Sequence, residues 1–180
     1  IRRVTRALNP RGYRAVPVAA PVGDERVHTY LWRFARSMPK RGNTVIFDRS
    51  WYGRMMVEPI EGFCTQEEYN RSASEINGFE RSIVESGGIV IKFWMEISKD
   101  EQLRRFEARR DNPLKRWKIT DEDWRNREKW PEYEAAVDEM LQKTSTENAP
   151  WYIIESNDKK YARIRTLKIL IKALEKRIEE

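Results

Sequence analysis

Apolar residues along this chain fall into short continuous runs that alternate with longer stretches in which they recur every three or four positions. The short runs are typical of buried strands and the longer spacing of amphipathic helices. The pattern predicts strands over residues 13–20, 44–47, 89–97 and 151–155. It predicts helices over residues 24–38, 65–86, 98–110, 131–146 and 161–180, and the end of a helix over 1–8. This alternation favours an α/β fold with one parallel sheet covered by helices on both faces.

Two of the predicted helices carry a clear apolar face. In the helix over 24–38 this face consists of Val27, Leu31, Phe34 and Met38. In the last helix it consists of Ile164, Leu167, Ile171, Leu174 and Ile178. Because the second stripe covers only about two heptads, we expect it to pack on the sheet rather than to form a coiled coil.

Residues 111–130 interrupt the alternation. They are rich in basic and aromatic residues and contain Pro113 near their start, and Pro131 follows their end. Such a stretch is typical of a solvated lid or loop above a site. No repeat, low-complexity tract or linker divides the sequence, so we expect a single domain over residues 1–180 that contains this lid.

The amino-acid composition indicates what kind of partner the protein binds. The 180 residues carry a net charge of +6 with a pI of about 9.5, and 36% of them are charged. This balance suits a polyanionic partner such as a nucleotide or polyphosphate, although many basic proteins bind none. A single cysteine, Cys64, excludes an internal disulfide and suits a cytoplasmic location, and a single histidine, His28, argues against zinc. No apolar run is long enough for a membrane helix.

The strand predicted over residues 44–47 ends in chemistry-bearing residues. Asp48 and Arg49 follow it directly, and Arg54 comes five residues later. Ligands of open α/β sheets bind beyond the carboxyl ends of strands. We therefore expect Asp48 to help hold a metal ion bound to phosphate, and the two arginines to bind phosphate oxygens. A strand-end Asp with a purely structural role is the alternative. A Gly-rich phosphate loop with a Lys is absent from the sequence.

Other candidates are less specific. Asp24 follows the first predicted strand and either lines an acceptor-nucleotide pocket or caps a helix. Glu58 and Glu61 are expected in salt bridges rather than at a metal. Arg105 and Arg109 lie four residues apart, and therefore on one helix face, where an anion or simple solvation relieves their repulsion. Better candidates for binding phosphate are the basic residues of the lid, Lys115, Arg116 and Lys118.

Several motifs together resemble the family-2 polyphosphate kinases. These are FDRSWYGR (47–54), LNPRGY (8–13), KRWKIT (115–120) with DWRNR (123–127), and TSTENAPW (144–151). They occur in order across the whole chain. Gly53 and the sequence VEPIEGF (57–63) are most similar to the branch that converts AMP to ADP.

The resemblance implies a P-loop kinase fold related to thymidylate kinase, and Mg²⁺-dependent phosphoryl transfer between inorganic polyphosphate and AMP or ADP. It implies that Asp48 is the metal-site acid and that Asp48, Arg49, Arg54 and Arg116 are catalytic. Substrate binding is assigned to Lys115, Lys118, Arg109, Asp24 and Arg11. It implies no nucleic acid and no membrane partner, and it is compatible with a homo-oligomer.

The sequence departs from the family at its start. The family's phosphate loop lies before the position of Ile1, and the chain opens within a helical pattern rather than at a Met. We therefore expect a piece of a longer protein that is inactive and poorly stable when expressed alone. Two alternatives stay open: a non-catalytic polyanion-binding domain, and a nucleoside monophosphate kinase that uses ATP.

Overall fold

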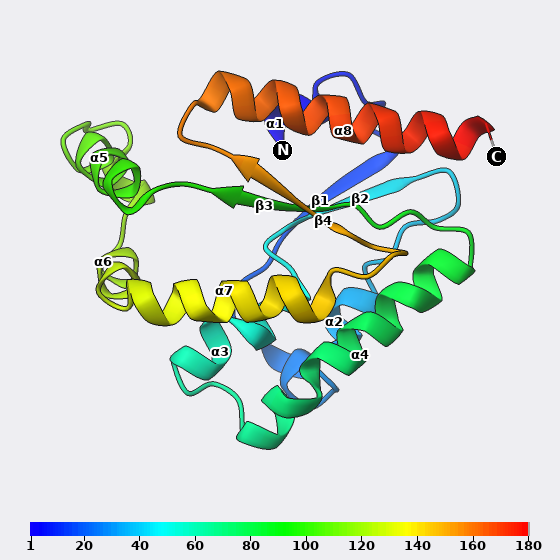
Figure 1. The fold of residues 1–180 in the computed structure, drawn as a ribbon, viewed down its shortest axis with the longest axis horizontal. Helices are drawn as coiled ribbons and strands as arrows, with labels where there is room; N and C mark the ends of the chain where they lie inside the picture. Colours follow the sequence, from blue (N-terminus) through cyan, green and yellow to red (C-terminus); the bar gives the residue numbers. More distant parts are fainter. Residues whose placement is uncertain (180) are drawn as a thin grey trace. The chain divides into compact units, whose positions relative to one another are not determined.

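The structure, a computed structural model, describes residues 1–179 and divides into two compact units, Ile1–Gly88 and Ile89–Glu180 (Figure 1). Each unit is an α/β assembly built around a pair of parallel strands. The α/β class and the parallel pairing predicted from the sequence are therefore confirmed.

The first unit contains the parallel strands β1 (Tyr13–Pro17) and β2 (Thr44–Asp48). Its helices are α1 (Arg2–Thr5), α2 (Trp32–Ala35), α3 (Val57–Ile60) and α4 (Gln66–Glu85), with 3₁₀ helices η1 (Gly23–Arg26) and η2 (Trp51–Met55). A cluster of aromatic rings forms its core: Phe34, Phe47, Trp51 and Phe79. The cluster joins β2 to η2, α2 and α4.

The second unit contains the parallel strands β3 (Lys92–Glu96) and β4 (Trp151–Glu155). Its helices are α5 (Lys99–Arg110), α6 (Asp121–Glu128), α7 (Trp130–Thr144) and α8 (Lys159–Glu179), with the 3₁₀ helix η3 (Arg116–Lys118). Ile154 and Met140 are fully buried, and α8 packs against β4. No helix among the described residues is long and apolar enough to cross a membrane.

The predicted single sheet differs from the structure. Within residues 1–179, β2 pairs only with β1 and β3 only with β4, so two two-stranded sheets replace one of four strands. Alternation of strands and helices dictates parallel pairing, but it carries no information about which strands are neighbours.

The helix predicted over residues 24–38 is also wrong, because the structure contains η1 and the single turn α2 instead. The intervening Val27, His28, Thr29 and Tyr30 are all weak helix formers. Val27, expected on the apolar face, is 81% exposed, whereas Phe34 is buried. By contrast, the Thr65 cap begins α4 as predicted, with the Thr65 hydroxyl accepting from the Glu68 amide.

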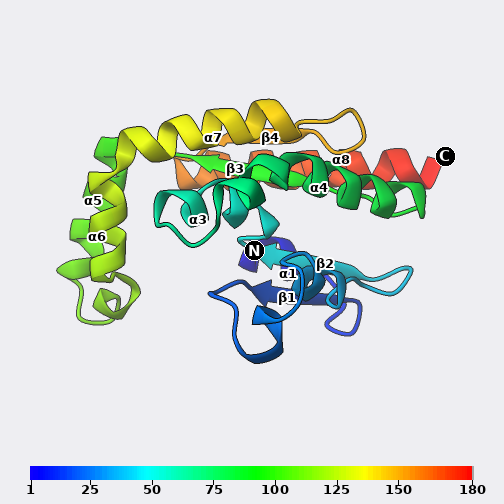
Figure 2. The ribbon, with the colours of Figure 1, turned by 90° about the horizontal axis from the view of Figure 1, so that it is seen from below.

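The apolar stripe of α8 does not form a core among the described residues. Ile164, Ile171 and Leu174 are between 42% and 56% exposed, and Ile178 is 83% exposed. A 21-residue helix is about 31 Å long, whereas a five-residue strand spans about 17 Å. The β3–β4 pair is therefore too short to cover the whole stripe. Helix α8 packs against β4 as predicted (Figure 2), but most of the stripe stays exposed among the described residues.

The lid segment is more ordered than predicted. Instead of a loop, residues 111–130 hold η3 and α6. Thr120 and Asp123 form a capping box, a pattern visible in the sequence, with the Thr120 amide donating to Asp123 Oδ2 at 2.9 Å. Trp124 packs edge-on against Phe106 with ring centroids 5.2 Å apart, so α6 is anchored to α5.

Candidate active site

The carboxyl ends of β1 and β2 lie level with each other. Pro17 is the register partner of Asp48, and the Val18 amide donates to the Asp48 carbonyl at 3.1 Å. The side chains of Asp48 and Arg49 are both exposed at this end. Among the described residues, neither side chain makes an ion pair. The strand end thus presents an acid and a guanidinium side by side to solvent, as the sequence predicts.

The backbone at Arg49 is strained. Its φ of +62° lies in the left-handed region, and it is the one non-glycine residue with positive φ among the described residues. This conformation costs a residue with a Cβ about 1 kcal/mol. Such strain persists where the surroundings impose it, and it clusters at functional sites. The geometry at Arg49 therefore favours a functional interpretation of the strand end.

The 3₁₀ helix η2 that follows Arg49 is anchored in the core of the first unit. Trp51 Nε1 donates to Glu80 Oε1 at 3.0 Å, and the Tyr52 hydroxyl donates to the same oxygen. All three residues are buried, with Glu80 only 1% exposed. The sequence analysis missed Glu80. Its signal was a carboxylate four residues after Ile76, and therefore on the apolar face of α4.

Arg54 is not an open phosphate clamp in this structure. Its Nε lies 2.6 Å from Glu58 Oε2 and its Nη1 lies 3.1 Å from Glu68 Oε1. The guanidinium also lies over the Tyr30 ring, 4.3 Å from the centroid, and the residue is 9% exposed. The expected salt bridge of Glu58 is confirmed. Phosphate binding by Arg54 stays a prediction.

The surroundings of Arg54 shift the pKa values of two nearby carboxyl groups and of one tyrosine hydroxyl. Burial raises the pKa of Glu58, and the Arg54 guanidinium opposes that rise. A backbone hydrogen bond from Thr65, and then Arg54, lower the pKa of Glu68. Burial, aided by Glu75, raises the pKa of the Tyr30 hydroxyl. One buried guanidinium is thus paired with two carboxylates in this cluster.

The remaining candidates of the first unit are exposed. Asp24 lies in the first turn of η1, where its carbonyl accepts from the Val27 amide at 3.2 Å. Arg11 lies in the turn before β1, where its amide donates to Asn9 Oδ1 at 3.0 Å. Their predicted roles in substrate binding stay predictions.

The second unit carries the basic lid residues on its surface. Lys115, Arg116 and Lys118 are all exposed and belong to η3 or its N-cap. Lys118 Nζ lies 5.0 Å from the centroid of the exposed Trp117 ring. Among the described residues none of the three cations makes an ion pair. Phosphate binding by these three cations stays a prediction.

The arginine-rich end of α5 is better compensated than expected. Glu101 pairs with Arg104 at 2.7 Å and with Arg105 at 2.6 Å, and these two arginines lower its pKa to about 2. Arg105 also donates to the Ser156 carbonyl. A carboxylate and a carbonyl therefore relieve the predicted repulsion with Arg109 without an anion. Arg109 itself is half-buried, and its substrate role stays a prediction.

A divalent metal ion fits the strand end only if the phosphates of the substrate supply some of its ligands. Within residues 1–179 no group of three His, Cys, Asp or Glu side chains gathers to hold a metal ion. Mg²⁺, however, is commonly held by one or two carboxylates together with water and substrate phosphates. A lone exposed Asp48 matches that donor set, and it does not match a fully protein-built site.

Comparison with known proteins decides the family. The family model of polyphosphate kinase 2 matches residues 1–180. The chain belongs to the polyphosphate kinase 2 family. It is 54% identical over 176 residues to the polyphosphate:AMP phosphotransferase of Pseudomonas syringae pv. tomato, covering 98% of this chain and 35% of that protein. The protein of the same name from Pseudomonas aeruginosa is also 54% identical, over 97% of this chain and 35% of its own length.

Solved structures agree with the family assignment. A crystal structure from Pseudomonas aeruginosa PA01 matches 99% of this chain and 38% of its own chain, with a TM-score of 0.96 and 52% identity. The structure of polyphosphate kinase 2 from Arthrobacter aurescens TC1 matches 95% of this chain and 60% of its own, with a TM-score of 0.91 and 37% identity. The chain thus spans about a third of the length of the two phosphotransferases that it resembles.

Proposed function

We propose that this chain is the nucleotide-kinase domain of a polyphosphate:AMP phosphotransferase with a P-loop-kinase type of architecture. The observation that carries the proposal is the strand end, where Asp48 and a strained Arg49 face solvent beside the end of a second parallel strand. Phosphoryl transfer needs a metal-holding acid and guanidinium groups in this position. The names of the two 54%-identical relatives supply the substrate pair.

In the proposed reaction a phosphate oxygen of AMP attacks the terminal phosphorus of the polyphosphate chain. The bridging P–O bond of that phosphorus breaks, the electron pair stays on the shortened chain, and ADP forms. Asp48 would hold Mg²⁺ together with substrate oxygens and water. The bound metal would neutralise charge on the phosphate oxygens.

The chain's own residues then do positioning and electrostatic work. Arg49 lies two residues before the buried Trp51 and contributes a guanidinium to the transferring phosphate. Lys115, Arg116 and Lys118 capture the polyanion, because they are exposed and carry no acidic partner among the described residues. Asp24 and Arg11 contribute to acceptor binding.

A donor–acceptor matrix tests the proposal on the full-length protein encoded by the gene. Polyphosphate or ATP is combined with AMP, ADP or GMP, and the nucleotide products are separated by chromatography. We expect ADP from polyphosphate and AMP in the presence of Mg²⁺. Transfer from ATP alone would make the protein an ATP-dependent nucleoside monophosphate kinase. Binding of polyphosphate without any transfer would make it a polyanion-binding domain.

A further inference from the structure

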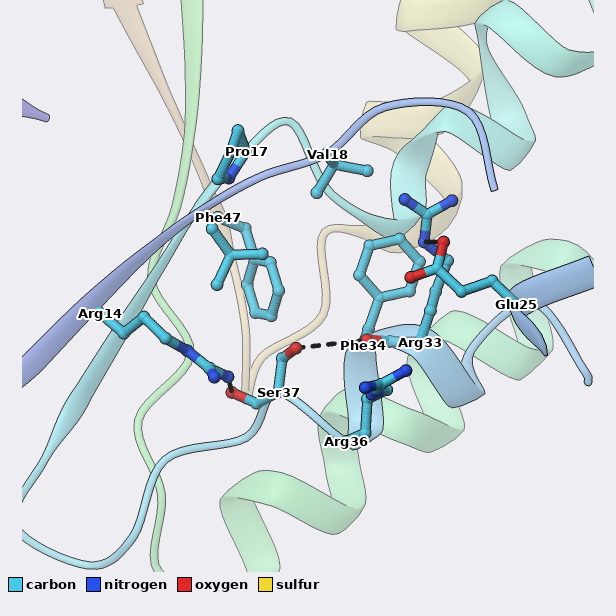
Figure 3. A pocket seen from close by; sticks show the side chains of 10 residues that line it. Arg14, Pro17, Val18, Glu25, Arg33, Phe34, Arg36, Ser37 and Phe47 are labelled. Carbon is cyan, nitrogen blue, oxygen red and sulfur yellow. Dashed lines mark hydrogen bonds and ion pairs between the residues drawn. The ribbon is translucent and has the colours of Figure 1, made fainter. Parts of the chain in front are cut away.

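A basic hollow lies on one face of the β1–β2 pair, outside every residue assigned to the site. Figure 3 shows the side chains that line it, with Arg14 from β1, Arg33 from α2 and Arg36, the residue that follows α2. Its volume is about 290 Å³, at the small end of the range for ligand pockets. Phe34 and Phe47 also line it.

Two of the three arginines of the hollow are held by backbone carbonyls, and the third lies over an aromatic ring. Arg14 Nη2 donates to the Ser37 carbonyl at 2.9 Å, and Arg33 Nη2 donates to the Ala19 carbonyl at 2.7 Å. Arg36 lies over the Trp32 ring, 4.8 Å from the centroid. A guanidinium has five N–H donors, so each anchored group keeps several for a ligand. The hollow therefore offers donors that are already oriented.

Positive charge in the hollow is only partly compensated. The single carboxylate there is Glu25, which lies 3.6 Å from Arg33. Among the described residues Arg14 and Arg36 make no ion pair, although each lines the same small cavity. Guanidinium groups without carboxylate partners favour phosphate oxygens, which they can bind in pairs.

The shape of the hollow favours an extended anion over a nucleotide. It runs along β1 from Arg14 to Val18, about 13 Å for four residues of strand. One end lies at Pro17 and Phe47, beside the strand end that carries Asp48. Phe34 is only 5% exposed and meets the Phe47 ring edge-on, so its face is closed to a nucleobase.

We propose that this hollow binds phosphate groups of the polyphosphate chain that lie away from its reacting end. The inference rests on the proposed function, since the donor must be a polyphosphate that reaches the strand end at Asp48. It assigns Arg14, Arg33 and Arg36 to a second contact region, which would strengthen binding of long chains and leave AMP binding unaffected.

Direct binding to the full-length protein tests this proposal, with calorimetry of long-chain polyphosphate, tripolyphosphate and AMP as separate arms. The test variant is Arg14→Gln with Arg36→Gln. The matched control is Lys40→Gln with Arg41→Gln, which removes the same charge from exposed residues just outside the hollow. We expect the test variant to weaken long-chain binding roughly tenfold, with a smaller loss for tripolyphosphate and none for AMP. The control should change long-chain binding less than about twofold.

Three outcomes overturn the proposal: unchanged long-chain binding in the test variant, equal losses in test and control, or an equal loss for AMP. Because Arg14 also supports the Ser37 carbonyl, the single variant Arg36→Gln, which leaves that hydrogen bond intact, must show part of the same loss. If the unmodified protein does not bind polyphosphate, the proposed function fails as well. If it binds polyphosphate and the test variant binds equally well, only the hollow is excluded.

Discussion

Arg54 of the first unit and the three lid cations of the second unit lie in opposite surroundings. In the first unit Arg54 is buried, paired with two carboxylates and stacked over Tyr30. In the second unit Lys115, Arg116 and Lys118 are exposed and have no acidic partner among the described residues. Equal charges therefore have different uses. In the proposed function the paired Arg54 has a structural role, whereas the unpaired lid cations attract the substrate.

The largest loss of turnover is expected from a substitution of Asp48, which lies at the end of β2 in the first unit. Asp48→Asn keeps the shape of the side chain and removes its charge, so turnover should fall about a hundredfold or more, about 3 kcal/mol of barrier. Steady-state rates across Mg²⁺ concentrations check this. Glu85→Gln, an exposed acid at the end of α4, is the control and should retain normal turnover. Near-normal rates for Asp48→Asn would show that Asp48 does not hold the metal ion.

A second prediction concerns stability. Arg54→Ala leaves Glu58, and in part Glu68, without a partner in a poorly hydrated place. We expect a loss of about 2 kcal/mol in the free energy of unfolding. Arg116→Ala removes an exposed cation and should change stability by less than about 0.5 kcal/mol. Urea unfolding measures both variants. Similar losses of unfolding free energy in the two variants would contradict the difference proposed between Arg54 and the lid cations.

The third prediction addresses capture of the substrate. Replacing Lys115, Arg116 and Lys118 with Gln should raise the KM for polyphosphate about tenfold and leave the KM for AMP nearly unchanged. The difference from the unmodified protein should shrink as salt rises, because exposed charges are screened. Lys160, Lys168 and Lys172, exposed on α8, provide a triple Gln control with the same loss of charge. An equal rise in both KM values would indicate a folding defect instead.

The smallest effect is expected at Glu101, where α5 balances its own arginines. Hydrogen bonds from Arg104 and Arg105 lower the pKa of this carboxyl from 4.5 to about 2 in the folded protein. Between these values the unfolded state binds more protons, so the stability that Glu101 contributes above pH 4.5 is lost as the pH falls toward 2. The gap in melting temperature between the unmodified protein and Glu101→Gln should therefore close over this interval. Glu107→Gln on the same helix is the control, and a gap that persists to low pH would contradict the assignment.

Local patterns predicted much of the fold. β4 is found at residues 151–155 as expected, and α4 begins at its Thr65 capping box. These features depend on neighbouring residues in the sequence. Two errors arose where distant packing decides, at the strand pairs and at the exposed stripe of α8. Both depend on how much surface another element offers, which the sequence pattern does not contain. The break between η1 and α2 is different, because the weak helix formers at residues 27–30 were visible in the sequence.

The candidate site was predicted in the same uneven way. Asp48 and Arg49 could be placed because a strand end is a local feature. The burial of Arg54 could not be predicted, because its partner Glu68 comes from a different helix. Glu80 was missed although its position on the apolar face of α4 was visible in the sequence. Its partners Trp51 and Tyr52 lie almost thirty residues away, and only the structure brings them together.

The most direct test of this division of roles is the initial rate as a function of polyphosphate concentration, taken to saturation at fixed AMP and Mg²⁺. It should be measured for the unmodified full-length protein, for Asp48→Asn and for the Gln variant of Lys115, Arg116 and Lys118. We expect the lid variant to approach the unmodified maximal rate at high polyphosphate and Asp48→Asn to stay far below it at every concentration. A lid variant that fails to recover, or an Asp48→Asn protein that does, would contradict the account.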